Sequence, residues 1–150
     1  MPVRDFVRAE GQRDVERRYS AEHLWVVGDG PLTTIGVTPY IAGRIGSPQH
    51  WQPPDVGAEL VRGEVFGEIE AGKVVCELTA PVTGGVVEVN EQVRDVPATI
   101  IDDPYGTWLV RLAGVGATDL NELLSEAEYH AYLTGGGVVH PFERRFSPPS

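Results

Sequence analysis

Residues 63–79 read GEVFGEIEAGKVVCELT, in which two runs of alternating apolar and polar side chains flank a short Ala-Gly-Lys turn. Alternation with a period of two is typical of β-strands, so residues 65–69 and 74–79 are predicted to pair as a hairpin. Gly72 suits a turn position with positive φ, because it has no Cβ to clash with the backbone. The pattern therefore places Lys73 at the tip of the hairpin, where its side chain projects into solvent.

Lys73 is the only lysine in a chain with 12 basic residues. A lysine amine, with an ordinary pKa of about 10.4, can lose its proton and attack an activated acyl group, whereas arginine stays protonated. Scarcity alone names no function, since a GC-rich genome also exchanges lysine for arginine. The position at a hairpin tip is what makes this amine a candidate attachment point for a covalently bound group.

Short runs that favour β-structure continue on both sides of the hairpin, separated by glycine and proline. They cover residues 19–27, 32–37, 58–61, 86–89 and 108–112. Short strands at this spacing predict a mainly β fold, a sandwich or a barrel. Thr38 is predicted to cap a short helix that has Pro39 at its first position, and residues 47–54 are predicted to form a loop.

The C-terminal part of the chain changes to helical signals. Leu120, Leu123 and Leu124 have helical spacing, and residues 125–128 (SEAE) form a capping box that predicts a second short helix through residue 133. We expect three parts: a flexible N-terminal arm (1–18), one folded domain (19–133) and a C-terminal tail (134–150).

Composition limits the classes of function. The 150 residues carry a net charge of −10, and residues 19–133 hold 17 acidic against five basic side chains, a local charge of −12. Such a surface repels phosphate backbones, so we expect no nucleic acid partner. It would attract protein partners with basic docking faces, although the acidic residues would also serve simply to keep the domain soluble.

Other signals indicate a cytoplasmic protein. The single cysteine excludes an intramolecular disulfide and fits a reducing compartment. The charged N-terminus does not resemble a signal or transit peptide, and no apolar stretch approaches the length of a membrane span.

Several residues that could suggest other chemistry have simpler explanations. Strand alternation places Cys76 on the face opposite Lys73, which predicts a buried structural cysteine. Asp102 and Asp103 precede Pro104 in a turn, and turn chemistry explains them without an acid/base pair. The four histidines have no spacing typical of metal ligands, so no metal site is expected.

The order and spacing of several motifs resemble the H proteins of the glycine cleavage system, from about residue 19 to residue 133. The lipoyl segment of that family usually reads Gly-Glu-x-x-Gly-x-x-Glu-Ser-Val-Lys-Ala, and it is matched by Gly63, Glu64, Gly67, Glu70 and Lys73. Residues 80–84 (APVTG), 86–90 (VVEVN) and 103–106 (DPYG) are similar to its Ser-Pro-Val-Ser-Gly, Val-Val-Glu-Val-Asn and Asp-Pro-Tyr-Gly. Each motif is loose, but their common order is specific.

The resemblance implies a barrel-sandwich hybrid fold with short C-terminal helices and a lipoate attached covalently to Lys73. It adds Glu70, Gly72, Glu77 and His23 as cofactor-binding residues; Glu77 stands where the family commonly has aspartate. It implies a non-catalytic carrier that shuttles an aminomethyl group and reducing equivalents on a lipoyl-lysine arm. The partners would be a lipoate ligase or an octanoyl/lipoyl transferase, and the P, T and L proteins. A monomer is expected, since a carrier that visits several enzymes gains from being small.

Departures from the family pattern leave alternatives open. The family usually has His-Glu-Trp where this chain has Leu24 in the middle, and that glutamate is expected to hold the aminomethyl nitrogen. Ala71-Gly72 replaces Ser-Val before the lysine. A carrier for another pathway, in sulfur metabolism or specialised biosynthesis, or an unlipoylated scaffold protein therefore remain alternatives. A biotin carrier is disfavoured because Gly72 and Val74 stand where such proteins have methionines. Lipoyl domains of 2-oxoacid dehydrogenases are disfavoured because they are shorter.

Overall fold

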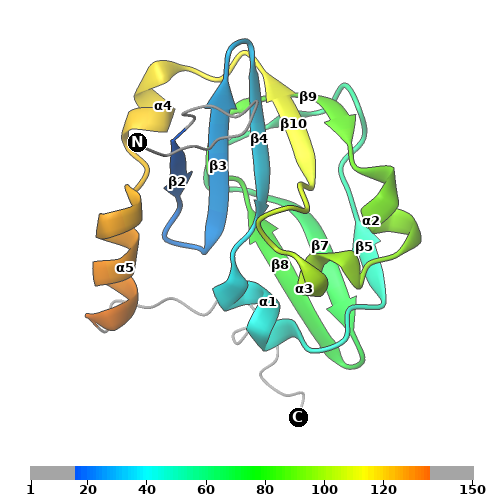
Figure 1. The fold of residues 1–150 in the computed structure, drawn as a ribbon. Coiled ribbons are helices and arrows are strands. Elements are labelled where there is room, and N and C mark those ends of the chain that lie inside the picture. The colour runs from blue at the N-terminus through cyan, green and yellow to red at the C-terminus, as the bar shows by residue number, and fades with distance from the viewer. Residues whose placement is uncertain (1–15, 136–150) are drawn as a thin grey trace, which may run out of the picture.

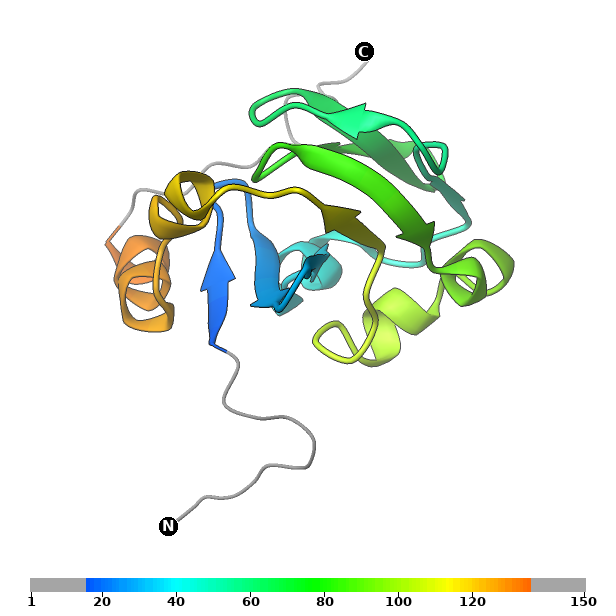
Figure 2. The same ribbon diagram turned by 90° about the horizontal axis from the view of Figure 1, so that it is seen from above.

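Two antiparallel β-sheets make up the centre of residues 16–135, which are the residues that the computed structural model describes. The larger sheet has six strands in the order β2-β3-β4-β10-β9-β6, and the smaller has three in the order β5-β7-β8. Figure 2 shows the smaller sheet lying over one face of the larger one. The strands are β2 (Arg17–Tyr19), β3 (Leu24–Asp29), β4 (Leu32–Val37), β5 (His50–Gln52), β6 (Glu59–Leu60), β7 (Val65–Ala71), β8 (Val74–Thr79), β9 (Gly84–Val89) and β10 (Val110–Ala113).

In the described part of the chain, five short helices connect and flank the sheets (Figure 1). They are α1 (Pro39–Ile45), α2 (Glu91–Asp95), α3 (Thr99–Asp102), α4 (Ala117–Asn121) and α5 (Glu126–Thr134). As predicted, the Thr38 side chain caps α1 and Pro39 occupies its first turn. The predicted capping box is also present, since Ser125 Oγ accepts from Glu128 N and Glu128 Oε1 accepts from Ser125 N. Within residues 16–135, no helix is both long enough and apolar enough to cross a membrane.

The hydrophobic core fills the space between the two sheets. Alternate residues of each strand point inward, so the core receives apolar side chains from both layers. The larger sheet contributes Leu24, Val26, Ile35, Val37, Val86, Val110 and Leu112, and the smaller contributes Trp51, Ile69, Cys76 and Leu78. A second, aromatic cluster joins α5 to the edge of the larger sheet, where Tyr129 stacks on Tyr19 with ring centroids 4.5 Å apart.

The predicted class, a mainly β sandwich with short C-terminal helices, is confirmed. The hairpin around Lys73 is also confirmed, although β7 runs two residues further than predicted, to Ala71. Residues 136–150 of the predicted tail and residues 1–15 of the predicted arm lie outside the described residues. Arg17 and Arg18 pair with β3, so the folded part begins before the predicted boundary.

Two local predictions are wrong, and two helices were not predicted. The strand expected over 19–27 is two strands, because a turn interrupts it: His23 takes φ +75°, and Ser20 Oγ accepts from Leu24 N at 3.2 Å. The loop expected over 47–54 contains β5, which forms because it pairs with β7. Helices α2 and α3 were not expected; the Asn90 side chain caps α2 by accepting from Gln92 N at 3.1 Å.

Candidate functional site

The hairpin of β7 and β8 ends in the two-residue turn Gly72-Lys73, since Ala71 and Val74 are the last paired residues. Gly72 has φ +64°, and Lys73 does not share this left-handed conformation. A positive φ at the first of two central residues is the pattern of a type II′ turn, whose twist matches that of the flanking strands. The Lys73 side chain is exposed at the apex of the hairpin.

Trp51 on β5 supports the hairpin from its inner face. The side chain is 3% exposed and packs against Gly67, whose missing Cβ would lie 2.8 Å from Trp51 Cζ3. The β5–β7 pairing, in which Trp51 faces Ile69, holds the ring in this place. The smaller sheet therefore carries Lys73 on a braced strand pair rather than on a free loop.

Cys76 lies on the inner face of β8 and is fully buried, as the strand alternation predicts. Burial, with a smaller contribution from the nearby Glu77, raises the pKa of the Cys76 thiol to about 12. The thiol therefore stays protonated and unreactive at neutral pH, because the thiolate is the nucleophilic form. Cys76 contributes to packing and offers no second reactive group beside the lysine.

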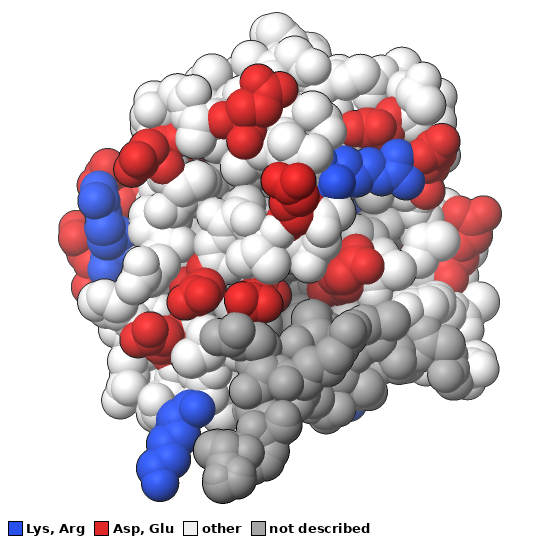
Figure 3. Space-filling model, turned by 180° about the vertical axis from the view of Figure 1, so that it is seen from behind, with Lys and Arg blue, Asp and Glu red and all other residues white. Residues whose placement is uncertain are grey.

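Carboxylates occupy the outward face of the same hairpin. Glu68 and Glu77 are directly opposite each other on β7 and β8. Glu70, two residues nearer the tip on β7, is opposite Val75. All three glutamates are half-buried. Figure 3 looks onto this side of the molecule and shows acidic side chains spread over it, with few basic ones. The face around the lysine is therefore negative, which favours encounter with basic surfaces.

Gln49, just before β5, reaches the tip of the hairpin, and nothing in the sequence pattern indicated it. Its backbone N–H donates to Glu70 O at 2.7 Å, and its side-chain Oε1 accepts from Gly72 N at 3.0 Å. The contact joins residues that are 23 positions apart in the chain. Only the pairing of β5 with β7 makes it possible.

His23 does not join the other predicted site residues. It precedes β3 in the larger sheet and is fully buried. Its Nδ1 lies 2.8 Å from Tyr129 Oη, and its ring stacks on Tyr40 with centroids 4.1 Å apart. The motif-based assignment of His23 to cofactor binding therefore has no support from its position, because an enclosed imidazole cannot present itself at the surface. Lys73, Gly72, Glu70 and Glu77 are brought together on one hairpin.

Leu24, which follows His23, is also fully buried and belongs to the main core. A leucine side chain has no hydrogen-bond acceptor, and this one faces the interior. It therefore contributes packing energy and no polar contact.

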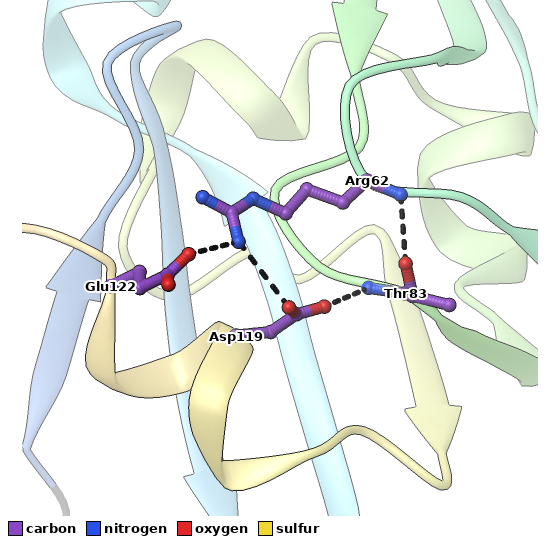
Figure 4. A network of polar contacts seen from close by, with 4 residues as sticks. All are labelled: Arg62, Thr83, Asp119 and Glu122. Atoms are coloured by element: carbon purple, nitrogen blue, oxygen red, sulfur yellow. Dashed lines mark hydrogen bonds and ion pairs between the residues drawn. The ribbon is translucent and has the colours of Figure 1, made fainter.

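A polar network away from the hairpin tip links the larger sheet's β6 end to α4, and no sequence pattern indicated it (Figure 4). Arg62 Nη1 donates to Glu122 and, at 3.3 Å, to Asp119 Oδ1. The two carboxylates, Glu122 more than Asp119, raise the pKa of the Arg62 guanidinium. Asp119 Oδ2 accepts from Thr83 N at 2.9 Å, and Thr83 Oγ1 accepts from Arg62 N at 3.0 Å. These four residues hold α4 against the two loops that precede β7 and β9.

Other candidate sites are not supported among residues 16–135. No group of three or more histidine, cysteine or acidic side chains is placed to hold a metal ion in that range. Asp103 serves the predicted turn, since its Oδ1 accepts from Gly106 N at 3.2 Å. These observations leave the lysine hairpin as the reactive feature of the described chain.

Comparison with known proteins identifies the architecture that presents this lysine. The family model for the glycine cleavage H-protein matches residues 17–135. The chain belongs to that family. It is 46% identical over 121 residues to the glycine cleavage system H protein of Beutenbergia cavernae, covering 80% of this chain and 95% of the relative. It is 39% identical over 119 residues to that of Clostridioides difficile, covering 79% of this chain and 95% of the relative.

A solved structure agrees with the family assignment. The crystal structure of the H protein from Mycobacterium marinum superposes with a TM-score of 0.69 at 36% identity, covering 82% of this chain and 99% of the other. The chain is therefore a glycine cleavage H-type carrier protein, and it is not an enzyme. The prediction of a non-catalytic carrier is confirmed.

Proposed function

We propose that this chain carries lipoate as an amide on Lys73 and presents it to the other proteins of the glycine cleavage system. The observation that carries the proposal is the exposed lysine at the apex of a two-residue turn, in a chain whose family normally bears lipoate. The tip has room for the enzyme that attaches the group, because a Cβ added at Gly72 would meet no heavy atom within 4 Å.

Attachment requires an uncharged Lys73 amine and an activated lipoyl or octanoyl donor. The Nζ lone pair attacks the acyl carbon, a C–N bond forms, and the bond from that carbon to the phosphate or thiol leaving group breaks. The nitrogen releases its proton to solvent, so an ammonium charge is replaced by a neutral amide. A lipoate ligase would use an acyl adenylate, and an octanoyl or lipoyl transferase a thioester.

The side chains of this chain orient and display the group rather than react. When attached, the dithiolane would supply a disulfide bond that can be opened, loaded and restored by thiol–disulfide exchange. The hairpin holds the attachment point away from the core, and the buried Cys76 thiol does not compete in that exchange. Glu70 and Glu77 add negative charge beside the arm, where P, T and L proteins with basic docking faces would approach.

The buried Leu24 motivates a finer proposal about the cargo. Where family members usually present a glutamate, this chain offers an apolar side chain in the core. We therefore expect the carrier to release a one-carbon amine cargo faster than relatives that have the glutamate. Incubation of the lipoylated protein with glycine and a decarboxylating P protein, followed by mass spectrometry over time, measures the lifetime. A loaded form as long-lived as that of the glutamate-bearing relatives would refute this part.

Intact-mass measurement tests the attachment directly. Expression in a host with lipoylation enzymes should add the mass of one lipoyl amide to the wild-type chain. The Lys73→Arg variant keeps the positive charge and should keep the unmodified mass. An unmodified wild-type chain in the presence of a competent ligase would instead favour a scaffold protein. A monomeric state and a cytoplasmic location stay predictions that the same preparation, by light scattering and fractionation, can check.

A further inference from the structure

Gln49 holds the tip of the lysine hairpin through two hydrogen bonds from outside β7 and β8. Its backbone N–H extends the β5–β7 ladder by donating to Glu70 O at 2.7 Å, and its side-chain oxygen accepts from Gly72 N at 3.0 Å. Pro48, immediately before it, is buried and fixes the direction from which the chain arrives. Gln49 itself is exposed, so core packing does not explain why its side chain lies across the turn.

Gly72 is the residue at the tip that most needs such a contact. Glycine loses more backbone freedom on ordering than any other residue, and Gly72 adopts φ +64° with open space around it. Its N–H lies within the turn and is not part of the β7–β8 ladder, which ends at Ala71 and Val74. The Gln49 oxygen therefore restrains the residue that directly precedes the lysine.

We propose that Gln49 is a positioning residue for acylation of Lys73; this rests on the proposed lipoate attachment. The hydrogen bonds of Gln49 go to Glu70 and Gly72 and not to the reacting amine. It acts through Gly72, by keeping the turn in one conformation before the modifying enzyme binds. The enzyme then recognises a preformed apex and does not have to order a glycine turn as it binds, so the contact lowers the KM for the carrier and leaves kcat unchanged.

The expected size follows from one neutral hydrogen bond at an exposed site. Such a bond contributes a net effect that corresponds to a change of about two- to tenfold in an equilibrium constant. The Gln49→Leu variant, whose uncharged side chain is one bond shorter and has no hydrogen-bond acceptor, should raise the KM for the carrier by about that factor. The amide proton of Gly72 should exchange with solvent faster by a similar factor, because it loses its acceptor.

The test measures acylation of the full chain by a purified lipoate ligase with ATP and lipoate, over a range of carrier concentrations. Gln49→Glu keeps an oxygen acceptor at the same reach and should bring the KM back to within about twofold of wild type. Gln52→Leu is the matched control, since Gln52 is exposed on β5 three residues away and should leave the KM unchanged. Circular dichroism confirms that each variant is folded.

The outcomes separate this inference from the function on which it rests. A raised KM for Gln49→Leu, restored by Gln49→Glu and absent in Gln52→Leu, supports a positioning role. A wild-type KM for a folded Gln49→Leu variant overturns the positioning role and leaves lipoylation of Lys73 intact. A lowered kcat with an unchanged KM also overturns it, since the ordering of the turn would then not be a cost of binding. A wild-type chain that the ligase cannot modify refutes the proposed function itself.

Discussion

Replacing Gly67 by alanine should weaken the hairpin that carries Lys73. An added Cβ would lie 2.8 Å from Cζ3 and 2.9 Å from Cη2 of Trp51, and 2.9 Å from the backbone oxygen of Gln52. All three distances are shorter than real Cβ contacts. The indole is buried and the oxygen belongs to the paired strand β5, so neither can move away without separating β5 from β7.

The size of the effect follows from overpacking a closed site. Forcing a methyl group into a packed core costs about 1–3 kcal/mol. Because the indole and the backbone oxygen are both fixed, we expect Gly67→Ala to lower the free energy of unfolding by about 2 kcal/mol, the middle of that range. For a domain of this size, about 4 °C of melting temperature corresponds to each kcal/mol, so the midpoint should fall by roughly 8 °C. Urea unfolding followed by circular dichroism measures the free energy, and a thermal scan measures the midpoint.

Gly85→Ala is the matched control for this prediction. Gly85 is also a strand glycine, but a Cβ there would meet no heavy atom within 4 Å, and its φ is not positive. We expect its free energy of unfolding to stay within about 0.5 kcal/mol of wild type. If Gly67→Ala proves as stable as Gly85→Ala, the inference that the indole and the β5 backbone require glycine at this position is refuted.

Three further predictions concern buried groups and the α4 network. The free energy of unfolding should fall as pH rises from about 9 towards 12, because the Cys76 thiol, with its raised pKa, binds its proton more tightly in the folded state. The slope of that free energy against pH should be smaller in Cys76→Ala, and equal slopes in urea titrations would refute this. Thr38→Val should cost about 2 kcal/mol, since the buried Thr38 hydroxyl donates to the backbone oxygen of His23 at 2.9 Å; an unchanged urea midpoint would contradict it. Asp119→Ala should cost about 1 kcal/mol and Glu122→Ala less than 0.5 kcal/mol, because only Asp119 also accepts from a backbone N–H; equal urea midpoints for the two variants would contradict the difference.

Local patterns predicted the parts of the fold that depend on neighbours in the chain. The alternation around Lys73 gave the correct hairpin, and the caps at Thr38 and Ser125 were correct, because a capping side chain bonds to backbone groups only a few residues away. The buried state of Cys76 followed from strand alternation and from the general tendency of free cysteine to be buried. For the same reason, strand alternation and the glycine turn were sufficient to place the lysine at an exposed tip.

The features that sequence patterns missed depend on contacts between distant segments. Strand β5 has three residues next to prolines and exists only because β7 offers it a pairing edge. The Gln49 contact with Gly72 and the Arg62 contact with Asp119 depend on that kind of long-range placement. His23 shows the converse: the family motif suggested cofactor binding, and its burial against Tyr129 and Tyr40 follows from how α5 and α1 pack, which the motif does not contain.

The indole of Trp51 gives the molecule a built-in optical reporter of the hairpin. It is buried in the main core beneath the smaller sheet, whereas Trp25 and Trp108 belong to the aromatic cluster at the larger sheet. In a chain whose other two tryptophans are replaced by phenylalanine, ultraviolet emission would come from this one buried ring. A red shift would then signal that water has entered beneath the lysine-bearing strands, before the rest of the domain opens.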